Sequence, residues 1–160
     1  WRRMALVTKE GQLYILPTYI FATLRNAARY TRKGRGSIQT AVSATLQCTD
    51  DRVLFDRWMP GFPNGQACDL ATVDVPPTDQ DEPVYVDIQG VVNPATKGRN
   101  VRYRLAASKG WSCSFTILFD KTVVSRGEME SVLIDAGRLV GLGNGRAVGF
   151  GRFEIVSVME

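Results

Sequence analysis

Hydrophobic and polar positions along the chain follow two periods, and together they predict helices and strands in alternation. Apolar residues at helical spacing predict one helix over residues 19–30 and a second from Ser125 to Val140. Alternation with a period of two predicts strands over residues 84–92, 101–106, 111–120 and 153–158. Residues 38–49 fit either a helix or a strand. The order favours an α+β fold with helices on one face of an antiparallel sheet.

The ends of the second helix carry recognisable signals. Ser125 and Glu128 have the spacing of a capping box, in which each side chain accepts a hydrogen bond from the other residue's backbone N–H. Gly141 follows the last apolar residue and is typical of a residue that ends a helix.

The middle of the chain is irregular and acidic. Residues 50–83 hold five of the seven prolines, and no clear period runs through them. We interpret this stretch as an insertion within a single domain, residues 1–160, because long loops in compact domains are often functional or disordered. Trp58, Met59 and Phe62 are expected to hold it against the core or against a partner subunit.

Residues 84–106 predict a long β-hairpin arm with its turn at residues 93–100. On the returning strand, Arg102 and Arg104 fall on the face opposite Val101 and Tyr103. With Lys97 and Arg99 they make the arm basic. The arm fits a contact with a polyanion, and it equally fits an edge whose cations prevent unwanted strand pairing.

A second basic group follows the first predicted helix. Arg25, Arg29 and Arg32 recur at i, i+4 and i+7, and Lys33 and Arg35 continue the charge. Two interpretations stay open. One is a binding site for a polyanion, and the other is a solvated helix face whose cations are favoured near the C-terminal dipole.

Charge is segregated along the 160 residues although the formal net charge is only +4. Residues 1–50 and 97–160 are basic, and residues 51–96 between them are acidic. Such asymmetry can present a positive surface to a polyanion and a negative surface to a neighbouring subunit. No apolar run approaches the roughly 20 residues that span a bilayer, so we expect no membrane partner.

The absence of histidine removes several classes of chemistry. It removes the commonest general acid/base and every Ser-His or Cys-His nucleophile pair. A zinc site would need ligands from three cysteines and from carboxylates, so no metal and no cofactor is expected. We therefore predict a protein that is not an enzyme. A nuclease that holds a metal with carboxylates is a third alternative, although the acids show no spacing that indicates such a site.

The three cysteines, Cys48, Cys68 and Cys113, are far apart and form no CxxC pair. This pattern argues against a disulfide framework and favours a reducing, cytoplasmic location. Cys113 lies on the apolar face of its predicted strand and is expected to be a small core residue. The chain begins at Trp1 rather than Met, which is typical of a fragment that lacks an N-terminal segment.

A glycine-rich loop runs from Gly141 to Glu154 between the second helix and the last predicted strand. Five glycines fall within eleven residues, with Arg146 and Arg152 beside them. A Rossmann fingerprint or a P-loop lies between a strand and a following helix, and no Gly-Lys-Ser/Thr occurs here. Both kinds of mononucleotide pocket are therefore excluded by context.

The stretch from Ala136 to Ile155 resembles the C-terminal glycine-rich loop of the RAMP superfamily, which supplies RNA-binding backbone and processing subunits of CRISPR effector complexes. Leu16 to Arg29 and Trp111 to Phe153, about a third of the chain, resemble small single-domain members encoded by phages and prophages. The resemblance implies a ferredoxin-like (RRM-like) antiparallel sheet with two main helices on one face. It also implies RNA binding along the loop and assembly in a row. Processing members often use a histidine, so its absence here argues for binding without cleavage.

The first functional hypothesis is a non-catalytic protein that binds RNA or another single-stranded nucleic acid as a homo-oligomer, in the host cytoplasm if phage-encoded. Phosphate contacts are expected from the basic side chains and from the loop amides: Arg25, Arg29, Arg32, Lys33, Arg35, Lys97, Arg99, Gly143, Asn144, Gly145, Arg146 and Arg152. The alternative is a phage structural or protein-interaction subunit that oligomerises without nucleic acid. It includes a CRISPR-inhibiting mimic of a backbone subunit, with CRISPR effector subunits as partners.

Overall fold

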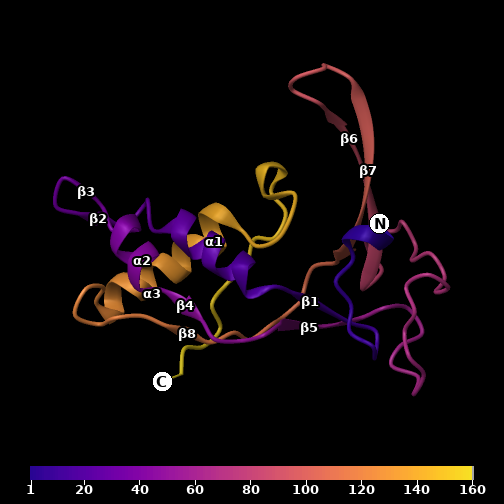
Figure 1. Ribbon diagram of the computed structural model, residues 1–160, viewed down its shortest axis with the longest axis horizontal. Coiled ribbons are helices and arrows are strands. Elements are labelled where there is room, and N and C mark those ends of the chain that lie inside the picture. Colours follow the sequence, from indigo (N-terminus) through magenta and orange to yellow (C-terminus); the bar gives the residue numbers. More distant parts are fainter. Residues whose placement is uncertain (160) are drawn as a thin grey trace. The chain divides into compact units, whose positions relative to one another are not determined.

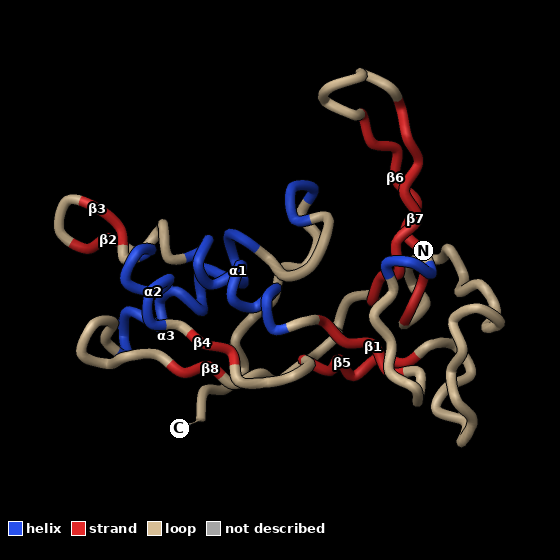
Figure 2. Tube along the Cα trace, in the orientation of Figure 1, coloured by secondary structure: helices blue, strands red, loops and turns tan. Residues whose placement is uncertain are grey.

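The computed structural model describes residues 1–159, in which the chain packs into two compact units. The first unit comprises residues 1–14 and 53–114, and the second comprises residues 15–52 and the chain from residue 115 onward. Helices and small antiparallel sheets make up the fold, as the α+β expectation required (Figure 1). Within the described residues the sheets are all two-stranded (Figure 2).

The first unit is built from two pairs of strands around a small core. β1 (Gln12–Ile15) pairs with β5 (Val53–Trp58), and β6 (Val84–Val92) pairs with β7 (Arg99–Ala107). A short 3-10 helix, η1 (Arg2–Met4), precedes β1. Leu13, Met59 and Val84 are buried at the centre of the unit. Half-buried side chains surround them, namely Trp1, Val7, Phe55, Phe62, Cys68, Leu70, Val73 and Leu105.

β6 and β7 form the predicted hairpin arm. Their antiparallel register runs from Val84 opposite Ala107 to Val92 opposite Arg99. At the tip, the Asn93 N–H donates to the Gly98 carbonyl at 2.9 Å, and Asn93 Oδ1 accepts from the Ala95 N–H at 2.9 Å. These bonds close the turn between the strands.

Residues 59–83 form no helix or strand, as predicted, but residues 53–58 of the stretch interpreted as irregular (50–83) form β5, so the prediction is wrong there. Met59 is buried and Phe62 packs against the core, which confirms that these two hold the segment in place. Trp58 is exposed instead. Arg2 adds a polar tie, because its guanidinium donates to the Leu70 and Val73 carbonyls at 2.7 and 3.0 Å.

The second unit holds the helices. α1 (Pro17–Ala27), α2 (Gln39–Thr45) and α3 (Arg126–Asp135) bury their apolar positions in a common core. β2 (Arg32–Lys33) pairs with β3 (Gly36–Ser37), and β4 (Gln47–Cys48) pairs with β8 (Ile117–Leu118). Residues 38–49 thus contain both a helix and a strand. In residues 1–159, no helix is long and apolar enough to cross a membrane.

α3 begins with the predicted capping box. Ser125 Oγ accepts from the Glu128 N–H at 3.3 Å, and Glu128 Oε2 accepts from the Ser125 N–H at 2.7 Å. α3 continues as a π-helix, η2 (Ala136–Val140), and ends at Gly141, whose φ is 84°. Both predicted ends are confirmed.

The prediction of a continuous sheet strand over residues 111–120 is largely wrong, although the predicted alternation of inward and outward side chains is correct. Trp111, Cys113 and Phe115 are half-buried while the serines between them are exposed. Carboxylates replace backbone partners at two positions, because Asp56 Oδ1 accepts from the Ser112 N–H and Asp50 Oδ2 accepts from the Thr116 N–H. A bridge at Cys113 and the short β8 remain, together with two backbone bonds that the Ser112 and Thr116 carbonyls accept from the Asp56 and Thr49 N–H groups at 3.0 and 3.2 Å.

The strand predicted over residues 153–158 is also absent as a sheet strand. Residues 152–159 pair with no other strand in the part of the chain that the structure describes. The Phe153 N–H donates to the Gly137 carbonyl at 3.3 Å, so this segment lies against η2 rather than in a sheet.

Candidate nucleic-acid interface

Five basic residues gather where α1 ends and the β2–β3 hairpin follows. We name Arg25, Arg29, Arg32, Lys33 and Arg35 the helix cluster, and all five are exposed in the second unit. The fold brings them together locally: α1 ends at Ala27, and Gly34, with φ of 60°, closes the tight turn between the two strands. The basic group that the sequence spacing predicted is therefore present in the structure.

Lys33 is already paired within the chain. Its Nζ lies 3.3 Å from Glu128 Oε1 and donates to the Val123 carbonyl at 2.9 Å. The lysine links β2 to the start of α3. Glu128 has a pKa below its usual value, chiefly because its carboxylate accepts the Ser125 N–H, with Lys33 as a smaller cause. Lys33 is thus less available to a ligand than the sequence suggested.

Arg29 is partly engaged at the C-terminal end of α1. Its guanidinium donates to the Asn26 carbonyl at 2.9 Å and to Asn26 Oδ1 at 3.2 Å. It also lies 5.9 Å from the centre of the Tyr30 ring. Tyr30 is exposed and was missed by the sequence reasoning, although an aromatic residue beside an arginine is a typical stacking platform for bases.

The other three arginines of the helix cluster have no such partners. Within residues 1–159, no ion pair or hydrogen bond engages the guanidinium groups of Arg25, Arg32 and Arg35. Guanidinium groups match phosphate oxygens in a planar, two-point geometry. These three side chains are therefore the strongest candidates for phosphate contacts.

Gly141 and Gly151 of the glycine-rich loop, and Gly137 before it, allow close backbone packing. A Cβ on Gly151 would lie 1.9 Å from the Leu142 carbonyl oxygen, and one on Gly137 would lie 2.0 Å from that of Phe153. The Leu142 N–H donates to the Gly151 carbonyl at 2.8 Å and closes the loop. Close packing thus explains these glycines without any ligand.

Part of the loop remains open to a ligand. The N–H groups of the three predicted loop residues Gly143, Asn144 and Gly145 form no hydrogen bond within the described chain. Asn144 and Arg152 are exposed and Arg146, in the short 3-10 helix η3 (Arg146–Val148), is half-buried. Thr23 Oγ1 of α1 donates to the Gly141 carbonyl at 3.1 Å, which anchors the start of the loop.

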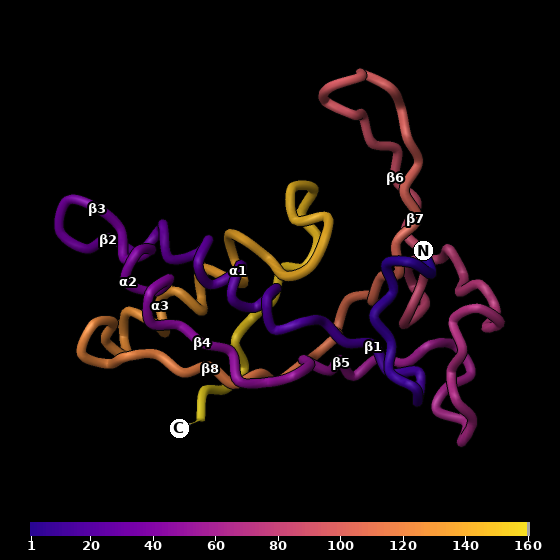
Figure 3. Tube along the Cα trace, in the orientation of Figure 1, coloured from indigo at the N-terminus to yellow at the C-terminus, as the bar shows by residue number. Residues whose placement is uncertain are grey.

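The predicted contact residues belong to both units, and those of the second unit form two groups. In the second unit the loop, yellow in Figure 3, lies apart from the β2–β3 hairpin, and α1 runs between them. Lys97 and Arg99 belong to the first unit, at the exposed tip of the arm. Lys97 has a φ of 56°, which is unusual for a residue other than glycine.

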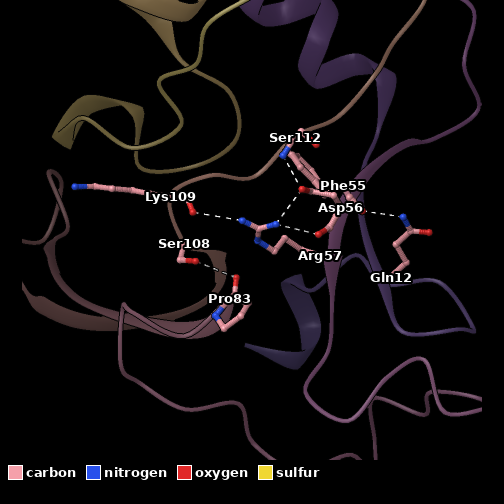
Figure 4. Close-up of polar contacts among 8 residues, drawn as sticks. All are labelled: Gln12, Phe55, Asp56, Arg57, Pro83, Ser108, Lys109 and Ser112. Atoms are coloured by element: carbon pink, nitrogen blue, oxygen red, sulfur yellow. Dashed lines mark hydrogen bonds and ion pairs between the residues drawn. The ribbon is translucent and has the colours of Figure 1, made fainter. Parts of the chain in front are cut away.

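The root of the arm is held by polar contacts to β5 (Figure 4). Arg57 donates to the Lys109 carbonyl at 3.3 Å and pairs with Asp56 at 3.0 Å. The Ser108 N–H donates to the Pro83 carbonyl at 3.1 Å. The base of the arm is therefore fixed within the first unit.

No group of three or more histidine, cysteine, aspartate or glutamate side chains among residues 1–159 is placed to hold a metal ion. All three cysteines are free thiols. Burial, with Asp56 as a second cause, raises the pKa of Cys113 to about 11, so its thiol stays protonated and a poor nucleophile.

The chain matches no protein-family model, no curated protein and no solved structure.

Proposed function

We propose that the protein is a non-catalytic RNA-binding or single-stranded nucleic-acid-binding protein that assembles as a homo-oligomer. The observation that carries the proposal is the helix cluster. Within residues 1–159 its Arg25, Arg32 and Arg35 are exposed and unpaired, and its Arg29 lies 5.9 Å from the centre of the exposed Tyr30 ring. The resemblance of residues 136–155 to a RAMP glycine-rich loop supports it, and with it a ferredoxin-like arrangement of the domain.

In this proposal the second unit provides the contacts. Guanidinium groups of the helix cluster bind phosphates, and the Tyr30 ring stacks on a base without reading its identity. The open amides of the loop, with Arg146 and Arg152, donate to further phosphates. Single strands fit better than a duplex because an aromatic platform needs an unstacked base.

Fluorescence anisotropy with labelled single-stranded RNA and DNA, titrated at several salt concentrations, tests the proposal. The logarithm of the binding constant K falls linearly with the logarithm of the salt concentration. For single strands, each phosphate contact that is lost reduces the magnitude of this slope by about 0.7. We expect the variant Arg25→Gln/Arg32→Gln/Arg35→Gln to lower that slope by about 2.

Arg126→Gln is the matched control, because Arg126 is an exposed arginine of the same unit that already pairs with Glu130 at 2.8 Å. It should bind as the unaltered protein does. A protein that binds neither RNA nor DNA at low salt, or a triple variant with an unchanged slope, contradicts the proposal.

A second candidate function is supported by exposed apolar residues on the arm, which fit a protein partner. In this case the chain is a structural or protein-interaction subunit that oligomerises without nucleic acid. Light scattering of nuclease-treated protein, with and without added oligonucleotide, separates the two: assembly alone, with no binding of oligonucleotide, favours the second.

A further inference from the structure

The outer part of the arm has two chemically different faces. The register places Ile88 opposite Tyr103, Gly90 opposite Val101 and Val92 opposite Arg99, so these residues share one face. The four large apolar residues of this face, which we name the apolar face, are about half exposed: Ile88 49%, Val92 58%, Val101 58% and Tyr103 49%. The opposite face carries two pairs, Gln89 with Arg102 and Val91 with Asn100, so it is mainly polar.

The outer arm has no cover within its own unit. Val84 to Asp87 are buried at the root, whereas beyond them the hairpin extends away from the rest of the first unit (Figure 1). A two-stranded hairpin is marginally stable in water unless it packs against something. An apolar face of this size on an isolated hairpin therefore indicates a binding surface.

The free edge of β6 in the outer arm also exposes backbone groups. The Val86 N–H donates away from β7, to the Pro77 carbonyl at 2.8 Å. Because outward groups alternate along an antiparallel strand, the N–H groups of Ile88 and Gly90 also face away from β7. The segment that covers β6 at Val86 does not continue along the outer arm.

The first unit also contains a segment whose charge is opposite to that of the arm. Residues 69–82, which we name the acidic segment, hold five exposed acids and no basic residue: Asp69, Asp74, Asp79, Asp81 and Glu82. The arm holds Lys97, Arg99, Arg102 and Arg104 and no acid beyond Asp87. Within residues 1–159, none of these nine charged groups forms an ion pair with another residue. Val75, at the middle of the acidic segment, is 59% exposed.

We propose that the arm of one copy docks on the acidic segment of a second copy, with its apolar face covered in the contact. Charge complementarity identifies the binding partner of the arm. The arm requires an acidic partner with exposed apolar surface, and the acidic segment has both properties. Because the two patches differ, the contact is head-to-tail and leads to a row or a ring of copies.

A nucleic acid fits this surface less well. Phosphates would satisfy the arm's cations, but they would leave Ile88, Val92 and Val101 uncovered and the acidic segment without any partner. The inference rests on the assembly part of the proposed function, and it assigns assembly to the first unit while nucleic acid contacts the second.

A charge-swap experiment on nuclease-treated, full-length protein tests the contact. One variant reverses the arm, Lys97→Glu/Arg99→Glu, at its tip and on its apolar face, and the other reverses the segment, Asp74→Lys/Asp81→Lys/Glu82→Lys. Asp69 and Asp79 are left unchanged because their carboxylates close local turns onto Ala71 and Asp81. Sedimentation velocity over a range of concentrations gives the association constant.

We expect the unaltered protein to self-associate and each variant alone to do so at least about tenfold more weakly, because like charges then face each other. Mixing the two variants should restore association, since each arm again meets a segment of opposite charge. Lys9→Glu/Lys109→Glu, which lies outside both patches, is the control and should associate normally.

The apolar contribution has its own variant. Val101→Thr/Tyr103→Thr keeps residues of high β-propensity but removes apolar surface, and it should weaken association. Gln89→Thr/Asn100→Thr, on the opposite face, should not.

A monomeric unaltered protein overturns the inference, as does association that survives either reversal or that mixing does not restore. If the protein is monomeric and the arm variant loses oligonucleotide binding, the arm is a nucleic-acid surface and the inference is likewise overturned. Self-association without any oligonucleotide binding would instead overturn the proposed function and leave the inference standing.

Discussion

Gly151 is the most constrained glycine of the loop. A Cβ there would lie 1.9 Å from the Leu142 carbonyl oxygen, and the φ of 72° adds backbone strain for any other residue. Gly149 has a φ of 93°, but a Cβ on it would meet open space. The two positions therefore separate the cost of a steric clash from the cost of the backbone conformation.

We expect Gly149→Ala to lower the free energy of unfolding by about 1 to 2 kcal/mol, the usual cost of a left-handed conformation. Gly151→Ala should cost about 3 kcal/mol or more, because the clash with backbone is added to that strain. Urea unfolding followed by circular dichroism measures both. Equal losses would contradict the steric explanation.

At the scale of elements, the junction of β2 with α3 depends on one carboxylate. Glu128 accepts the Ser125 N–H and pairs with Lys33, and its pKa lies below its ordinary value of 4.5 for these reasons, the Ser125 bond first. A depressed folded-state pKa means that the carboxylate's contribution to stability is fully present above pH 4.5. It is lost as the pH falls through the lowered value.

Glu128→Gln should therefore lower stability at neutral pH and reduce the loss of stability on acidification below pH 4.5. Urea unfolding at neutral and acidic pH compares the two proteins. Glu130→Gln is the control, because Glu130 pairs only within α3, with Arg126. A pH dependence that Glu128→Gln leaves unchanged would show that the carboxylate does not act as described.

Elements whose signals are local were predictable from the sequence. The helix that begins with α3 was predictable, because Ser125 and Glu128 mark its start and Gly141 marks its end, and each signal lies within one turn of the end that it marks. The ladder expected over residues 111–120 was not, since Asp56 and Asp50 reach Ser112 and Thr116 across 56 and 66 residues. An alternation of apolar and polar residues indicates which side chains are buried. It does not indicate which groups form hydrogen bonds with the backbone.

The candidate site divides in the same way. The helix cluster is local in sequence and was found as a group, but the partner of Lys33 lies in α3 and could not be anticipated. The loop glycines were interpreted as possible approaches to a ligand, whereas Gly137 and Gly151 serve contacts with the chain's own backbone. Spacing alone cannot distinguish these two uses of a residue without a side chain.

At the scale of the whole molecule, basic residues in two units raise the question of which unit binds phosphates. We expect Lys97→Gln/Arg99→Gln in the first unit to leave the salt slope of oligonucleotide binding unchanged at concentrations where the protein is monomeric. The helix-cluster variant in the second unit should lower that slope by about 2. Anisotropy titrations of both variants and of the combined variant measure this.

Slopes that fall with both variants and add in the combination would show that the arm tip contacts phosphates as well. That result would support the sequence-based expectation for Lys97 and Arg99. It would contradict the division of labour between the two units.

The unbonded amides of Gly143 to Gly145 have a practical consequence for observing a ligand. They lie between Leu142 and Phe150, whose N–H groups are both held by backbone carbonyls at 2.8 and 3.2 Å. In deuterated water the open amides should exchange fast and the held ones slowly. The held amides of Leu142 and Phe150 therefore serve as an internal reference. A ligand that binds the loop would slow hydrogen exchange at Gly143 to Gly145 while the exchange rates of the two held amides stay unchanged.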